Sequence, residues 1–190
     1  MEIKNYIKIV NDFLPYSALS SLLQWVNLKN NKFEKAKVIT NGNEKIIEEI
    51  RKVDNFGFDQ NSKSKTEIHW CRFLSYYFTQ LCQKYENDLK VKTSVNNLTD
   101  LIFLKYENGG HYKTHSDHSG KAPRTLSIIY LLNNDYEGGE LIFKSPDEKD
   151  ELIKIKKPNT AVIWPSNFLY PHQVNPVTKG LRYSIVSWVV

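Results

Sequence analysis

Apolar positions in the first half of the chain recur with the period of an α-helix. The stripe in residues 16–28 consists of Ala18, Leu19, Leu22, Leu23 and Val26. Pro15 or Ser17 lies where such a helix can begin. A second stripe, in 66–87, consists of Trp70, Phe73, Leu74, Tyr77, Leu81 and Tyr85. Spacings of three and four residues predict two helices. The polar, glycine-containing segment 35–63 between them predicts a short strand followed by a mobile or surface loop.

From residue 92 the pattern changes to short runs of β-branched and aromatic residues. The runs are LTDLIFLKY, RTLSIIYLL, ELIFK, ELIKIKK, TAVIWP and LRYSIVSWVV, separated by turn signals such as ENGG, KKPN and NPVTKG. Two helices followed by many short strands indicate an α+β chain, with helices on one side of an all-β sandwich or barrel. We expect a single domain over 1–190, with helical support at about 10–90 and a β core at about 92–190.

Length and composition fit one globular domain. A chain of 190 residues buries roughly two-thirds of its extended surface on folding, and 41% hydrophobic residues can fill that core. No apolar run approaches the roughly 20 residues that span a bilayer, and polar residues interrupt the N-terminal sequence. Cys71 and Cys82 fall in the second predicted helix, about 16 Å apart, which is too far for a disulfide. We therefore expect a cytoplasmic protein with reduced thiols and no membrane partner.

The net charge of +5 mildly favours an anionic partner. The lysines are scattered, however, and the tightest cluster is Lys154, Lys156 and Lys157. No basic and aromatic residues interleave as a base-stacking platform would require. The charge is better explained as a solvated surface, and direct nucleic-acid binding is not expected.

One short motif carries the chemistry. His115 and Asp117 are two residues apart, and such residues point to the same face of a strand. One more imidazole completes a two-histidine, one-carboxylate metal site, which leaves coordination positions open for other ligands. His172 directly precedes another predicted strand and is the best third ligand. His118 has the wrong offset, His111 lies in a glycine turn, and His69 is on a predicted helix.

The surroundings of this motif resemble a known family. Tyr106, Gly109, Tyr112, His115 and Asp117 follow the spacing Tyr-x-x-Gly-x-x-Tyr-x-x-His-x-Asp, which is similar to the signature of prolyl 4-hydroxylase-like Fe(II)/2-oxoglutarate oxygenases. The sequence GGELIF and the stretch from Trp164 to His172 resemble the hairpin and third-ligand strand of that family. The resemblance covers about 98–190 and implies a double-stranded β-helix, a jelly-roll fold, with Fe(II), 2-oxoglutarate and O2, and ascorbate as a candidate reductant.

The resemblance also assigns cosubstrate residues. Arg182, ten residues after His172, corresponds to the basic residue that holds the far carboxylate of 2-oxoglutarate, and a guanidinium suits that role because its fork matches a carboxylate. Ser184 and Tyr106 are expected to add hydrogen bonds. Some relatives carry a tyrosine at the position of Leu131. Its absence either loosens cosubstrate binding or is compensated by Tyr130.

For the substrate, the resemblance points to a prolyl residue of an intracellular protein, with a ribosomal or translation protein favoured. Arg124 aligns with a peptide-contacting arginine, and Arg51 and Asp54 fall in the substrate-covering region of relatives. Trp188 stands where nucleic-acid demethylases of the superfamily carry a second arginine. Two alternatives stay open. The first is an oxygenase acting on a lysyl residue, a free amino acid or another small molecule. The second is a metal-binding interaction domain without catalysis.

Overall fold

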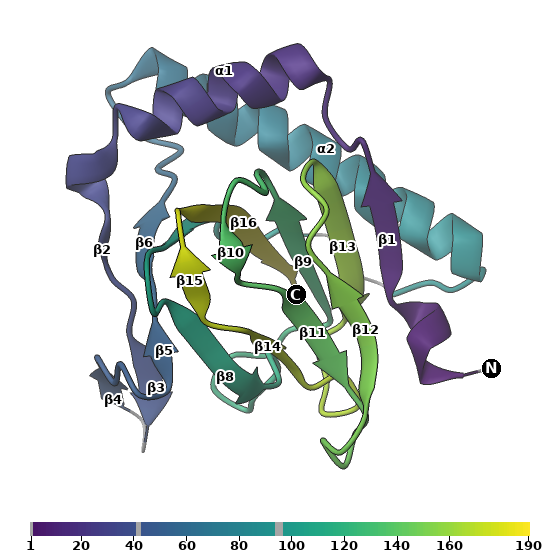
Figure 1. The fold of residues 1–190 in the computed structure, drawn as a ribbon. Coiled ribbons are helices and arrows are strands. Elements are labelled where there is room, and N and C mark those ends of the chain that lie inside the picture. The colour runs from purple at the N-terminus through teal and green to yellow at the C-terminus, as the bar shows by residue number, and fades with distance from the viewer. Residues whose placement is uncertain (1, 41–42, 94–96) are drawn as a thin grey trace.

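A computed structural model describes residues 2–40, 43–93 and 97–190. Two antiparallel sheets face each other, and two long helices cross the outer surface of the larger sheet (Figure 1). Along the second half of the chain, strands pass repeatedly from one sheet to the other. The expected all-β core with N-terminal helices is therefore confirmed, and the arrangement is that of a double-stranded β-helix.

The larger sheet has seven strands in the order β1-β13-β9-β16-β7-β6-β2. Their bounds are Lys8–Asn11 (β1), Thr160–Pro165 (β13), Leu126–Leu131 (β9), Arg182–Val189 (β16), Ile102–Tyr106 (β7), Asp54–Gly57 (β6) and Glu34–Lys35 (β2). The smaller sheet has the order β12-β11-β14-β8-β5. Its bounds are Glu151–Ile155 (β12), Leu141–Lys144 (β11), His172–Val174 (β14), His111–His115 (β8) and Arg51–Lys52 (β5). Two further pairs are β10 (Glu137–Gly138) with β15 (Val177–Lys179), and β3 (Val38–Thr40) with β4 (Asn43–Lys45).

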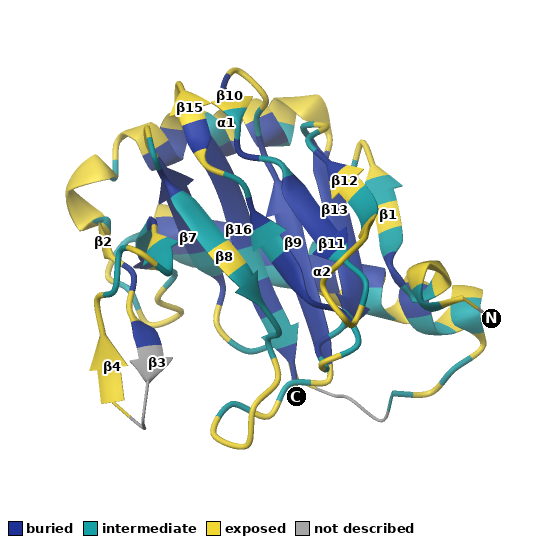
Figure 2. Cartoon of the chain, turned by 60° about the horizontal axis from the view of Figure 1, so that its bottom comes forward, coloured by how far each residue is buried: buried dark blue, intermediate teal, exposed yellow. Residues whose placement is uncertain are grey.

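The central strands of the larger sheet are buried on both faces, as Figure 2 shows for β9, β13 and β16. All six residues of β9 are buried, which explains why this strand reads as a continuous apolar run. Its alternate side chains divide between two cores. Ile128 and Tyr130 pack under the helices, whereas Ile129 and Leu131 face the smaller sheet. The second of these cores surrounds the candidate site.

Helices α1 (Tyr16–Asn27) and α2 (Lys65–Leu89) confirm the two predicted helices to within two residues at each end. The α2 N-terminus is capped by Ser64, whose side chain accepts a hydrogen bond from the Glu67 backbone N–H. Its apolar face packs on the larger sheet through Leu74 and Phe78, both fully buried. Cys71 and Cys82 are free thiols on this helix, as expected. No helix among the described residues is long and apolar enough to cross a membrane.

The segment 35–63 departs from the expectation of one short strand and a loop. It forms parts of two sheets: β6 pairs with β7, β5 pairs with β8, and β3 and β4 form a hairpin. Residue 1 and residues 41–42 and 94–96 lie outside the described residues, so the expected loop is not described at 41–42. The side chains of β2 and β4 are exposed. These strands are held by backbone hydrogen bonds at sheet edges, and such pairing leaves no apolar alternation in the sequence.

Candidate metal centre

The two metal-site strands lie next to each other in the smaller sheet. His115 is the last residue of β8, His172 is the first of β14, and the two are directly paired in the sheet register. Asp117 lies just beyond β8 in a bend, rather than on the strand as expected. One ligand atom from each of these three residues lies within 4.8 Å of the others. Sheet pairing thus brings together side chains that are 57 residues apart in the sequence (172 − 115).

Backbone hydrogen bonds orient both imidazoles. The Nδ1 atom of His115 lies 2.8 Å from the Lys113 carbonyl oxygen, and Nδ1 of His172 lies 3.1 Å from that of Tyr170. Because a carbonyl can only accept, each Nδ1 carries a proton, and Nε2 is the nitrogen that keeps its lone pair in the neutral form of such a ring. Both Nε2 atoms lie 3.6 Å from a carboxylate oxygen of Asp117. In metal sites, a hydrogen bond from the histidine nitrogen that does not bind the metal fixes the tautomer of the ring in this way.

The pKa shifts of His115 and Asp117 favour the binding of a cation. Burial, reinforced by the neighbouring His172, lowers the pKa of His115 to about 3, so this imidazole is neutral at neutral pH. Burial opposes ionisation of Asp117, but the adjacent His172 and His115 outweigh it and hold its pKa below the ordinary value. Two imidazoles beside one carboxylate form a donor set that suits Fe(II) and other divalent transition metals. The residues present therefore fit such an ion.

The other histidines lie elsewhere, as the sequence predicted. His118 contacts the backbone of Arg124, with Nδ1 2.8 Å from its carbonyl oxygen. His111 contacts the Gly109 carbonyl oxygen through Nδ1 at 2.9 Å. His69 is exposed on α2. Within the described residues, His115, Asp117 and His172 form the one histidine, cysteine and carboxylate cluster that could hold an ion.

A cavity beside these three residues opens between the two sheets. Its wall is mostly apolar and aromatic: Leu104, Tyr106, Tyr112, Ile129, Leu141, Trp164, Val174, Val186 and Trp188, together with Arg51. Tyr112 stacks on the His115 ring with centroids 3.6 Å apart. Phe143 and Trp164 hold the His172 ring from other sides. The wall therefore limits both ring rotation and the entry of water.

Arg182 is fully buried on β16 and packs against the cavity wall. Its guanidinium lies 4.8 Å from the Tyr106 ring centroid. Nε donates to the Gly139 carbonyl oxygen at 2.8 Å, and Nη1 donates to Ser184 Oγ at 2.9 Å. Gly139 has a φ of +64°, and a Cβ there would lie 3.0 Å from Arg182 Cδ, so the glycine is required on both counts. This explains the GGE sequence of the hairpin.

Three buried side-chain nitrogens have no hydrogen-bond partner among the described residues: Arg51 Nε, Trp164 Nε1 and Arg182 Nη2. Arg51 and Trp164 line the cavity, and Arg182 packs on its Tyr106 wall. A buried donor left unpaired costs about 1–3 kcal/mol, and an acceptor on a bound ligand would remove that cost. All three are donors only, which calls for an acceptor-rich molecule. A dicarboxylate such as 2-oxoglutarate fits this requirement.

The sequence left open whether Tyr130 compensates for Leu131. The two side chains point to opposite faces of β9, and the Tyr130 hydroxyl donates to Asn159 Oδ1 at 2.8 Å, under the helices. Tyr130 therefore does not face the cavity. Tyr136, which the sequence analysis missed, lies beside Arg182 instead. Burial raises the pKa of its phenol, and the guanidinium charge opposes that shift.

The expected substrate residues separate in space. The guanidinium of Arg124 stacks 3.6 Å from the Trp188 ring centroid, and its Nη1 lies 3.8 Å from Asp117 Oδ1. Arg51 lines the cavity with its guanidinium 4.7 Å from the Tyr112 ring centroid. Arg124 therefore contacts the cluster through Asp117, whereas Arg51 reaches the same cavity beside Tyr112.

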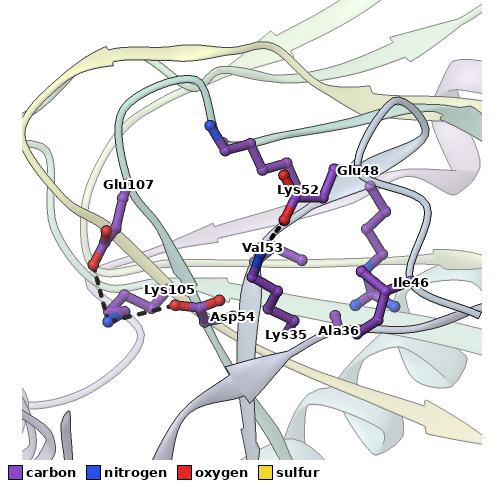
Figure 3. A pocket seen from close by; sticks show the side chains of 11 residues that line it. Lys35, Ala36, Ile46, Glu48, Lys52, Val53, Asp54, Lys105 and Glu107 are labelled. Carbon is purple, nitrogen blue, oxygen red and sulfur yellow. Dashed lines mark hydrogen bonds and ion pairs between the residues drawn. The ribbon is translucent and has the colours of Figure 1, made fainter.

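Asp54 is not brought to the metal centre. It lies in a neighbouring charged groove, where Lys105 Nζ contacts its carboxylate at 3.6 Å and that of Glu107 at 3.0 Å (Figure 3). Lys35 and Glu48 form a second ion pair in the same groove. Arg51 lines both this groove and the metal cavity. Although Arg51 and Asp54 are close in sequence, β5 and β6 belong to different sheets.

Comparisons with known proteins agree with this geometry. Residues 101–190 match the model of the 2OG-Fe(II) oxygenase superfamily. A PKHD-type hydroxylase from Gloeothece citriformis is 36% identical over 95 residues, which cover 47% of this chain and 41% of that protein. One from Rippkaea orientalis is 24% identical over 96% of this chain and 78% of its own length. The chain thus spans less than half of some curated relatives that it matches.

Two solved structures show the same fold. A prolyl hydroxylase from Trichoplax adhaerens, in complex with a peptide fragment of a hypoxia inducible factor oxygen degradation domain, aligns with a TM-score of 0.79 and 22% identity over 97% of this chain and 83% of its own. A prolyl-4-hydroxylase from Pseudomonas putida aligns with a TM-score of 0.75 and 20% identity, covering 96% of this chain and 91% of that one.

Proposed function

We propose that the chain is a prolyl hydroxylase-like member of the 2OG-Fe(II) oxygenase superfamily, whose model matches residues 101–190, and that it is a dioxygenase that hydroxylates a prolyl residue of a protein. The observation that carries the proposal is a three-residue cluster that could hold a metal, together with a buried arginine that has an unpartnered donor and packs on Tyr106 of the cavity wall. Neither feature alone identifies an oxygenase. Together they provide for a metal and for an anionic cosubstrate.

His115, Asp117 and His172 would hold Fe(II), because two imidazoles and a carboxylate occupy only part of its coordination sphere. When bound, iron with 2-oxoglutarate and O2 supplies the oxidising chemistry for inserting oxygen into a C–H bond, with release of succinate and CO2. We propose ascorbate as an accessory reductant. The backbone carbonyls of Lys113 and Tyr170 accept from the Nδ1 atoms, so that the Nε2 atoms would be the ones to bind the ion.

Arg182 would bind the carboxylate of 2-oxoglutarate that is remote from the metal. Its Nε and Nη1 are already used by Gly139 and Ser184, which fixes the guanidinium plane and leaves Nη2 for the ligand. Tyr106 lies under the guanidinium and lines the cavity, so its phenol is placed to add a hydrogen bond. Ser184 acts by holding Arg182. The apolar wall keeps this charge pairing away from water, which strengthens it.

A prolyl residue is the proposed target because the cavity beside the metal cluster is lined by Tyr112 and Trp188, which suit an apolar, preorganised ring. Arg51 and Arg124 provide donors for peptide carbonyl groups near the same cluster. We propose a ribosomal or translation protein as the favoured substrate. The peptide bound by the Trichoplax relative gives precedent for a protein segment as the substrate class.

Two experiments test the proposal in order. First, the Fe(II)-loaded protein should convert 2-oxoglutarate to succinate slowly without substrate, and Asp117→Ala should not. Absence of turnover in the unaltered protein would favour a non-catalytic metal-binding domain. Second, proteins of a host lysate incubated with the enzyme should gain about 16 Da on proline, the mass of one oxygen atom. Consistent modification of lysine, or of a free amino acid or other small molecule, would replace the prolyl substrate and leave the oxygenase assignment intact.

A further inference from the structure

Trp164 is the unexplained residue of the cavity wall. It lies on β13 opposite Ser127 of β9, and only 2% of its side chain is exposed. Its Nε1–H is buried without a partner among the described residues. An indole can donate but cannot accept, and a buried tryptophan usually finds an acceptor for this group. A phenylalanine would fill a similar space without leaving a donor unpaired.

The neighbours of Trp164 place it at the metal end of the cavity. Its ring centroid lies 4.9 Å from that of His172 at an interplanar angle of 72°, and 4.9 Å from that of Phe143 at 81°. Both neighbours are aromatic rings, which offer at most a weak contact to an N–H. The protonated Nδ1 of His172 is already used by the Tyr170 carbonyl. Nothing in the wall therefore replaces the missing acceptor.

We propose that Trp164 is a positioning residue for the cosubstrate, and that its indole N–H donates to an oxygen of the 2-oxo acid end of 2-oxoglutarate. This inference rests on the proposed function. It assigns two of the three unpartnered donors to opposite ends of one molecule. Trp164 contacts His172, whereas Arg182 packs against Tyr106 and donates to Ser184. A protein substrate is the poorer candidate for the acceptor, because Trp164 is on the inner wall and almost fully buried.

The test compares Trp164→Phe with Trp70→Phe. Trp70 is also buried, at 6% exposure, but it packs in the helix-side core away from the cavity. Calorimetric titration of 2-oxoglutarate into the Zn(II)-loaded proteins should show about tenfold weaker binding for Trp164→Phe, as expected for one hydrogen bond to a charged acceptor. Trp70→Phe should bind like the unaltered protein. Zn(II) affinity should be the same in all three.

Oxalate separates the two ends of the cosubstrate. It chelates a metal through adjacent carboxylates but has no remote carboxylate for Arg182. Trp164→Phe should weaken oxalate binding, whereas Arg182→Met should leave it unchanged. If Trp164→Phe is poorly folded, replacement of Trp164 by benzothienylalanine keeps the ring shape and removes only the N–H, and the same weakening is expected.

The outcomes distinguish this inference from the proposed function. If the unaltered protein does not bind 2-oxoglutarate, the proposed function fails and the inference fails with it. If the unaltered protein and Trp164→Phe bind 2-oxoglutarate equally, the inference alone is overturned. Loss of Zn(II) affinity in Trp164→Phe would also overturn it, because the residue would then act by supporting His172. A downfield shift of the Trp164 indole proton on adding 2-oxoglutarate to the Zn(II) protein would support it directly.

Discussion

The Arg182→Met variant separates the stability cost of burying the guanidinium from the contribution of that guanidinium to 2-oxoglutarate binding. The guanidinium is fully buried, has no carboxylate partner within the described residues, and makes two neutral hydrogen bonds, at 2.8 Å to Gly139 and at 2.9 Å to Ser184. Methionine fills similar space and removes the charge. Each lost hydrogen bond costs about 1 kcal/mol, while relief from burying an unpaired cation returns several kcal/mol. We therefore expect the ligand-free variant to be at least as stable as the unaltered protein.

Ligand binding should change in the opposite direction. Removing one partner of a buried charge pair costs about 2–5 kcal/mol, or roughly 30-fold and more in the dissociation constant of 2-oxoglutarate. At a concentration 100 times the original dissociation constant, 2-oxoglutarate stabilises the unaltered protein by about 2.7 kcal/mol. A 30-fold weaker site leaves about 0.9 kcal/mol. For a domain of this size that difference lowers the ligand-induced rise in Tm from about 5–11 °C to about 2–4 °C.

The assay is thermal unfolding of the Zn(II)-loaded protein with and without 2-oxoglutarate. Ser184→Ala is the matched control, because it removes only the hydroxyl that accepts from Nη1 and should reduce the ligand-induced shift slightly. An Arg182→Met variant that 2-oxoglutarate stabilises as fully as the unaltered protein would refute the assignment. A ligand-free variant destabilised by several kcal/mol would refute the reasoning about the buried charge.

Three other predictions concern the metal, the substrate and the core. Asp117→Ala and His172→Ala should abolish succinate production while the far-UV circular dichroism spectrum is retained; more than a small residual activity in either would contradict the cluster as the iron site. Arg124→Ala should slow peptide hydroxylation more than substrate-free 2-oxoglutarate turnover. If both rates fall equally, Arg124 acts by positioning Asp117, whose carboxylate lies 3.8 Å from its guanidinium, rather than by binding the peptide. Leu74→Ala, at a fully buried position of α2, should lower the free energy of unfolding by about 2–5 kcal/mol in urea titrations, and a change under 1 kcal/mol would show that the helix-side core can collapse around the cavity.

The elements that could be predicted from the sequence are those whose buried apolar side chains form a regular pattern. Helices α1 and α2 have continuous apolar stripes, and β9 and β13 are buried on both faces, so their patterns are legible. His172 could be identified because it lies where a predicted strand begins. The pairing of β14 with β8 places it next to His115.

The rest depended on backbone pairing and on three-dimensional contacts. The polar strands β2 and β4 have no apolar periodicity to detect. Arg51 and Asp54 both fall in the region that resembles the substrate-covering loop of relatives, but the chain changes sheets between them. Tyr130 could have been excluded from the cavity by strand alternation alone, since Leu131 must face the other way. The unpartnered nitrogens of Trp164 and Arg182 have no sequence signal, because a missing contact is visible only in the folded molecule.

The N-terminal strands have a consequence for any attempt to isolate residues 101–190, the segment that matches the superfamily model. In the larger sheet, β13 is flanked by β1 and β7 by β6; in the smaller sheet, β8 is flanked by β5. A fragment restricted to 101–190 would lose all three neighbours and also the helices that cover the larger sheet. Exposed strand edges recruit further strands, so such a fragment should aggregate rather than fold. Truncation boundaries and fusion points therefore need to preserve the first 57 residues together with α2.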